Sequence, residues 1–298
     1  MQKHGFLYAL GAYTIWGLFP VYWKSLHQVP AIELIGHRIF WSFLTLLGVL
    51  TFSGQVGVFW YHLTQARIRR FYLIAALLIG LNWLVYVWGV NSNHIVETSL
   101  GYFINPLLSV LLGVLILRER LRPFQWLPVG VATAGVLYLT VIYGRIPWIA
   151  LTLACTFALY GLVKKLAPLN SLHGLSLETA LLFPLAFAYL LYREINRQAA
   201  FLHSDTITTL LLLGAGLVTT VPLLMFASAA QRIPLSAIGL MQYIAPTLQF
   251  LIGVAVYREP FSRPHLIGFS LVWMALALFA AESLWQEHRK RQRKEPVA

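Results

Sequence analysis

Charged residues are scarce in this sequence: they make up 11% of its 298 residues, whereas a soluble domain of this length carries roughly 25%. Hydrophobic residues make up 59% of the chain. This number of charges is too small to cover a surface that faces water. Most of the outer surface must therefore face an apolar medium, and lipid is the plain candidate. The composition therefore favours an integral membrane protein.

Cysteine and the common catalytic motifs are also lacking. The single cysteine, Cys155, excludes an intramolecular disulfide and a cysteine-based metal site. The nine histidines show no spacing typical of metal ligands, so no metal or cofactor is expected. No HExxH, GxSxG or GxxxxGK string occurs, which counts against a metalloprotease, a serine hydrolase and an ATP-driven pump. A membrane-embedded lipid-modifying enzyme and a non-transporting membrane partner protein stay open as alternatives.

The formal net charge of +12 would fit a nucleic-acid-binding protein. However, the densest basic run is residues 288–294, directly after an apolar segment near the C-terminus. A run in that place is typical of anchoring to anionic membrane lipid on the cytoplasmic side. Because no soluble region remains to support a nucleic-acid site, we expect lipid and not nucleic acid beside this chain.

Long apolar runs recur along the whole sequence, and a membrane-spanning helix needs about 20 mostly apolar residues. Only the connections 53–70 and 192–206 exceed a tight turn, which leaves no room for a soluble catalytic domain. The sequence therefore predicts an all-α integral membrane protein with ten transmembrane helices. The expected spans are 5–26, 31–53, 71–91, 97–117, 123–143, 147–163, 174–192, 208–230, 235–257 and 264–285.

Lysine and arginine are distributed unevenly between alternate connections. Of the 22 such residues, 15 fall on the side of the N-terminus, six fall on the opposite side, and Arg38 lies within a span. Cytoplasmic loops carry the excess of these residues in membrane proteins. Both termini are therefore predicted to be cytoplasmic.

The two halves of the chain match each other at an offset of 140 residues. Residues 100–106 (LGYFINP) lie over residues 240–246 (LMQYIAP), and the same offset pairs Arg118-Glu119 with Arg258-Glu259. A repeat of five spans, an odd number, must enter the membrane in the opposite orientation the second time. We therefore expect two inverted-topology repeats, at 1–143 and 144–285, followed by a basic cytoplasmic tail at 286–298.

Several strings give the chain a likeness to a known family. They are the stretch from Val29-Pro30-Ala31 to His37-Arg38, the string SLGYFINP at 99–106 and the string VTTVPL at 218–223. With its two five-span halves, the chain resembles the drug/metabolite transporter superfamily, within it the EamA family, and most narrowly the RarD proteins. The likeness runs from about residue 5 to residue 281.

The resemblance implies a bacterial inner-membrane permease that exports drugs or metabolites. RarD proteins are associated with chloramphenicol, and relatives in the superfamily carry amino acids, sugars or nucleotide conjugates. The implied function is a secondary transporter of small amphiphilic molecules that works by alternating access, with proton coupling left open. The resemblance leaves the physiological substrate, the direction of transport and the oligomeric state open.

Polar residues inside the second span are the first candidates for a substrate site, because such groups are costly in hydrocarbon and need a partner, a cavity or water. Glu33, His37 and Trp41 recur every four residues and share a helix face, with Arg38 beside them. Arg38 could attract a carboxylate or an electron-rich group, and Glu33 or His37 could carry a proton. Alternatively, Glu33 suits the helix dipole and pairs with His37 or Arg38.

The third, fourth and ninth spans supply the remaining candidates. Asn82 and Tyr86 are expected to line a cavity, or else to form hydrogen bonds between helices. Tyr102 and Asn105 share a face of the fourth span, and Gln242 and Tyr243 lie at the matching place in the ninth.

Each of these two spans also contains a proline, Pro106 or Pro246, which cannot donate to the carbonyl four residues earlier. We expect the two prolines to interrupt their helices, to free the carbonyls of Tyr102 and Gln242, and to act as hinges. The alternative is a static kink.

Overall fold

The computed structural model describes residues 2–91, 95–143 and 148–256, together with scattered positions between 263 and 282. These residues form helices joined by short connections, and no strand occurs among them. The helices are α1 (Gln2–Lys24), α2 (Ala31–Phe52), α3 (Val56–Thr64), α4 (Ala66–Asn91), α5 (Ile95–Leu115), the short 3-10 helix η1 (Pro123–Gln125), α6 (Trp126–Tyr143), α7 (Trp148–Lys165), α8 (Ser171–Ile195), α9 (Thr206–Ala230), α10 (Leu235–Met241) and α11 (Ile244–Ala255).

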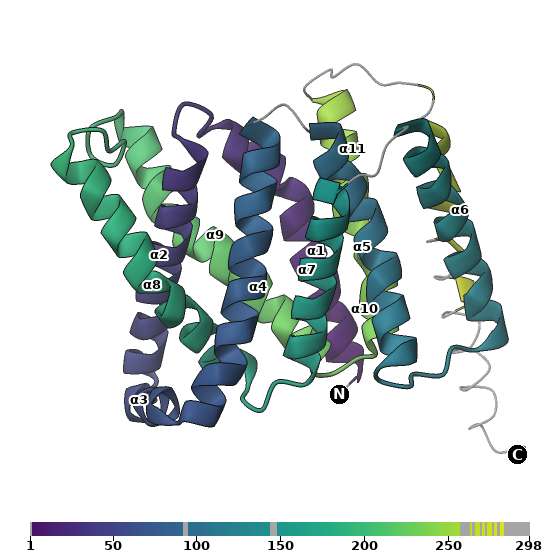
Figure 1. Cartoon of the computed structure of the whole chain (residues 1–298), viewed down its shortest axis with the longest axis horizontal. Coiled ribbons are helices and arrows are strands. Elements are labelled where there is room, and N and C mark those ends of the chain that lie inside the picture. The colour runs from purple at the N-terminus through teal and green to yellow at the C-terminus, as the bar shows by residue number, and fades with distance from the viewer. Residues whose placement is uncertain are drawn as a thin grey trace, which may run out of the picture.

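The long helices lie side by side and run between two ends of the molecule (Figure 1). The N-terminus and α3 lie at one end, which we call the α3 end, and residues 25–30 connect α1 to α2 at the opposite end. Long helices that follow each other along the chain, such as α1 and α2 or α8 and α9, run in opposite directions, whereas α10 and α11 continue in the same direction. The basic tail 286–298 lies outside the described residues.

Five of the expected spans form helices that are long and apolar enough to cross a membrane: Ala31–Phe52, Ala66–Gly89, Trp148–Lys165, Ser171–Ile195 and Thr206–Ala230. An all-helical, multi-pass membrane protein is thereby confirmed. The other expected spans coincide with α1, α5, α6 and the pair α10–α11, and most of 264–285 lies outside the described residues. The expected connection 53–70 holds α3, whose Phe59 packs against Leu50 and Tyr72.

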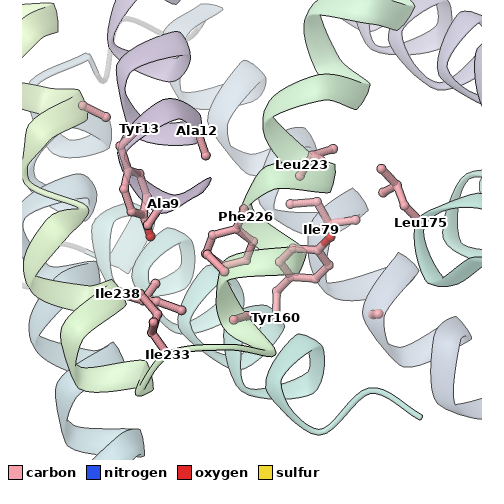
Figure 2. Close-up of a cluster of buried hydrophobic side chains, with 14 of the residues drawn as sticks. Ala9, Ala12, Tyr13, Ile79, Tyr160, Leu175, Leu223, Phe226, Ile233 and Ile238 are labelled. Carbon is pink, nitrogen blue, oxygen red and sulfur yellow. The ribbon is translucent and has the colours of Figure 1, made fainter. Parts of the chain in front are cut away.

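Large apolar side chains cover much of the outer surface, as the exposure of Leu77, Leu185 and Leu217 illustrates. The interior holds a cluster in which small residues of α1 and α9 let the helices approach, and aromatic rings fill the space between them. Figure 2 shows Tyr13, Tyr160 and Phe226 in this cluster, and the rings of the last two are stacked with centroids 6.0 Å apart.

The two prolines differ in their effect on the helices. The ninth span is split, because α10 ends at Met241 and α11 begins at Ile244. By contrast, α5 continues through Pro106, so the expected interruption of the fourth span is wrong. A single proline removes one backbone hydrogen bond, and the flanking bonds keep the helix intact.

The expectation of a free carbonyl at Gln242 is also wrong. Its carbonyl accepts a hydrogen bond from the backbone N–H of Ala245, at 3.2 Å. The turn at the helix break tightens to an i to i+3 bond, which satisfies the group that Pro246 would leave without a partner.

Candidate functional site

A cavity of about 480 Å³ opens at the end opposite α3. It lies between the last turn of α1, the connection to α2, the first two turns of α2 and α4 near Tyr86. Leu34, Ile35 and Val87 contribute to its apolar wall, and Arg38 and Tyr86 bring polar groups into it. A largely apolar pocket with a few convergent polar groups is the usual form of a small-molecule site.

Arg38 lies seven residues into α2, about 10 Å along the helix from its first residue. Its guanidinium carbon lies 4.9 Å from the ring centroid of Trp23 and 4.4 Å from that of Trp83. Its Nε donates a hydrogen bond to the Thr219 hydroxyl at 3.1 Å. The aromatic faces attract the cation through their quadrupoles, so the guanidinium is held between α1, α4 and α9.

The close approach of α9 to α2 makes the Thr219 contact possible. A Cβ atom on Gly216 would lie 2.5 Å from the carbonyl carbon of Trp41, so only glycine fits there. The Ser42 hydroxyl donates to the Gly216 carbonyl at 3.3 Å. Gly216 and Thr219 are three residues apart and therefore share a face of α9, which brings the hydroxyl to Arg38.

Glu33 does not pair with Arg38. One of its carboxylate oxygens lies 3.0 Å from a guanidinium nitrogen of Arg193, and the other accepts a 2.6 Å hydrogen bond from the backbone N–H of Ala200. The His37 ring nitrogen Nε2 lies farther away, at 3.9 Å. Glu33 is fully buried, and its contacts tie the start of α2 to the end of α8 and the following loop.

His37 is buried and is not among the residues that line the cavity. The Trp41 indole N–H donates to its Nδ1 at 3.2 Å, which assigns the ring proton to Nε2 in the neutral form. That Nε2 is enclosed and has no hydrogen-bond partner among the residues that the structure describes. The rings of His37 and Trp41 both pack against Phe201.

Two tyrosines connect the cavity to α5. The rings of Tyr86 and Tyr102 lie edge to face, with their centroids 5.8 Å apart. Both hydroxyls, and that of Tyr22, lie within electrostatic range of Arg38. A guanidinium is thus surrounded by aromatic faces and phenol oxygens.

The other predicted site residues lie in helix contacts. Asn82 donates to the Leu153 carbonyl and to the Thr156 hydroxyl, both at 2.9 Å, and so joins α4 to α7. Asn105 is buried and accepts from the Ser109 hydroxyl at 3.4 Å. Gln242 is buried at the helix break, and the Tyr243 hydroxyl donates to the Phe103 carbonyl at 3.1 Å. These contacts favour packing roles.

Replacing Asn82 with alanine is expected to lower the free energy of unfolding by about 1 kcal/mol, because hydrogen bonds between membrane helices contribute about that much. Ligand affinity should stay within about twofold of wild type, since Asn82 does not contact the cavity. Unfolding in mixed micelles and ligand binding to the same preparation would measure both quantities. A large loss of affinity at unchanged stability would contradict the packing role.

Trp23 and Thr219 contact Arg38 but were not predicted as site residues. Trp23 lies in the last turn of α1, where tryptophan is expected at the membrane interface on general grounds. Thr219 lies in an apolar helix, and hydroxyls there commonly bond to the backbone. Neither residue carries a signal that sequence alone could have separated from these ordinary roles.

Comparison with known proteins adds a family to this geometry. Residues 3–141 match the model of the EamA-like transporter family. The chain is 46% identical to the uncharacterized transporter YojE of Bacillus subtilis, over 97% of each chain. It is 43% identical to the protein RarD of Streptomyces exfoliatus, over 100% of this chain and 94% of that one. This chain belongs to the EamA family and, within it, to the RarD proteins.

The fold of this EamA protein recurs in a solved crystal structure. That structure aligns with a TM-score of 0.71 and 18% identity, and the alignment covers 96% of this chain and 100% of the other. Membership in the EamA family makes the chain a membrane transporter, within the drug/metabolite transporter superfamily.

Proposed function

We propose that this protein is a secondary active transporter that moves small amphiphilic metabolites or drugs across the bacterial inner membrane. Chloramphenicol and amino-acid-like compounds are the first candidates. The observation that carries the proposal is the cavity around Arg38, which is open at the end opposite α3 while the aromatic cluster of Tyr13, Tyr160 and Phe226 fills the bundle interior. The family and the names of its relatives favour this reading over a membrane enzyme.

Transport would proceed by alternating access, with ten spans arranged as two inverted repeats and both termini in the cytoplasm. In that arrangement the present structure faces outward. The hydrogen bond from Tyr243 to Phe103 supports the repeat, because it joins two positions that the offset of 140 pairs with each other. The split between α10 and α11, next to Pro246, supports a hinge in the second half. In the first half, α5 would bend at Pro106 while its helix stays continuous.

Proton coupling, if present, would use His37 in preference to Glu33. The carboxylate of Glu33 is already engaged by the Arg193 guanidinium and by the backbone N–H of Ala200. The His37 Nε2 has no hydrogen-bond partner among the residues that the structure describes, and it lies 3.9 Å from the Glu33 carboxylate.

Flux into liposomes tests the proposal. Purified protein should give saturable uptake of labelled chloramphenicol or amino acids, measured with and without an imposed pH gradient. Arg38→Ala is expected to lower the flux at least about 10-fold, because an interaction with a charged group contributes about 1.5–3 kcal/mol. Arg69→Ala is the matched control, since Arg69 is exposed at the start of α4.

Flux that follows the pH gradient would show proton coupling, and saturable flux indifferent to it would show a facilitator. Flux no greater than that of empty liposomes, across a broad set of amphiphiles, would contradict the proposed function.

A further inference from the structure

Arg38 differs from the other charged groups of the bundle interior. Glu33 has Arg193 at 3.0 Å, and Lys164 and Glu178 lie 2.6 Å apart, with each side chain 1% exposed. Among the described residues, by contrast, no carboxylate lies within 4 Å of the Arg38 guanidinium. An ionised group at this depth is costly unless an anion neutralises it. The described residues supply aromatic rings and hydroxyls but no such anion.

The contacts of Arg38 leave one part of the guanidinium open. The guanidinium carbon lies over the rings of Trp23 and Trp83, and the Thr219 hydroxyl accepts a hydrogen bond from Nε. In the part of the chain that the structure describes, neither Nη atom has a hydrogen-bond acceptor. The two Nη groups form the fork that binds carboxylates or sulfonates through paired hydrogen bonds.

We propose that the cavity is selective for organic monoanions, whose carboxylate or sulfonate binds the Nη groups of Arg38 while an apolar body lies against Leu34, Ile35 and Val87. This inference rests on the proposed function and specifies its substrate class. Tyr86, which also lines the cavity, adds a hydroxyl beside the anionic group. A neutral amphiphile of the same shape leaves the cation without a partner and binds less tightly.

The charge of the substrate gives transport a direction. A monoanion that crosses without a coupled ion responds to the membrane potential, and about 100 mV, negative inside, shifts its equilibrium distribution about 50-fold toward the outside. If no ion is coupled to the anion, the membrane potential of an energised cell therefore drives its export, whatever the orientation of the binding site at a given moment.

Binding to the purified protein tests the anion preference. The ligands are 3-phenylpropionate and 3-phenylpropanamide, which share their shape and differ in charge. We expect the acid to bind about 10- to 100-fold more tightly than the amide, by calorimetry at neutral pH. Arg38→Gln should remove that preference by weakening acid binding alone, and Arg38→Lys, which keeps the charge but loses the fork, should retain part of it.

Equal affinities for acid and amide in the wild-type protein would overturn the proposal. So would an undiminished preference for the acid in Arg38→Gln. If Arg38→Gln does not fold, the comparison of wild type with Arg38→Lys decides the question, because a fork at Arg38 predicts at least a severalfold loss of acid affinity in the lysine variant.

Flux tests the direction. Liposomes are loaded with labelled 3-phenylpropane-1-sulfonate, which stays charged at every relevant pH, and a potassium diffusion potential is imposed with valinomycin. The ratio of outside to inside label should rise about 50-fold per 100 mV, negative inside. A distribution indifferent to the potential would overturn the claim that charge drives export. Transport of neutral amphiphiles without any preference for anions would overturn this inference and leave the proposed function intact.

Discussion

Replacing Lys164 with methionine is expected to lower the free energy of unfolding by about 3–5 kcal/mol. Lys164 and Glu178 form an ion pair with an N–O distance of 2.6 Å, and both side chains are 1% exposed. The other carboxylate oxygen of Glu178 accepts a 2.9 Å hydrogen bond from Tyr160. Methionine fills a similar volume, so the loss comes from a buried carboxylate that has no cation.

The double variant Lys164→Met/Glu178→Met is the matched control. Because it removes both charges, it should recover most of the loss, and its stability should lie within about 1–2 kcal/mol of wild type. Unfolding of wild type, Lys164→Met, Glu178→Met and the double variant in mixed micelles would give the coupling energy of the pair. A double variant as unstable as the single one would contradict this account.

The same pair shows where sequence reasoning stops. Lys164 was counted among the cytoplasmic loop cations, because the expected span ended at residue 163. In the structure α7 continues for two more residues to Lys165, and Lys164 lies in the interior beside Glu178. Apolar composition predicts the existence of a membrane helix well and its ends poorly, since the last turn can be buried by neighbours that sequence does not reveal.

Sequence alone could indicate only part of the candidate site, because the rest depends on neighbours that the sequence does not reveal. Arg38 stood out because an arginine inside an apolar segment is costly, and that rule needs no knowledge of neighbours. Tyr86 lines the cavity. Asn82 lies on nearly the same face of α4, yet it donates a hydrogen bond to α7. Whether a side chain on this face lines the cavity or contacts another helix depends on how distant segments of the chain pack together. The contact of Trp23 with Arg38 depends on that packing as well.

The hinge prediction marks a further limit. Two prolines at matching positions suggested two equivalent breaks, but α5 is continuous at Pro106 and the chain turns before Pro246. The related sequences in the two halves thus pack against different neighbours, and the proline alone does not decide whether the helix is interrupted. At the start of α10, the backbone N–H groups of Leu235 and Ser236 donate hydrogen bonds to the carboxylate of Glu119, which lies far away in the sequence. These bonds fix where α10 begins. The residue paired with it by the repeat, Glu259, lies outside the described residues.

Gly216→Ala is expected to lower the free energy of unfolding by about 3 kcal/mol, because overpacking of a tight contact costs that much where the backbone cannot yield. A Cβ atom there would lie 2.5 Å from the carbonyl carbon of Trp41 and 2.6 Å from its oxygen. These are backbone atoms of a packed helix, so α9 itself has to shift away from α2. The shift would also draw Thr219 away from Arg38 and weaken ligand binding.

Gly48→Ala is the control. Gly48 lies on α2, the helix that Gly216 contacts, and a Cβ atom added to it has no other atom within 4 Å. Alanine in a helix interior is favoured over glycine by roughly 1 kcal/mol, so this variant should be as stable as wild type or more so. Unfolding in mixed micelles measures stability, and calorimetry with 3-phenylpropionate measures affinity. Equal stability of the two alanine variants would show that α2 and α9 are not held in this close contact, and the geometry that brings Thr219 to Arg38 would then have to be abandoned.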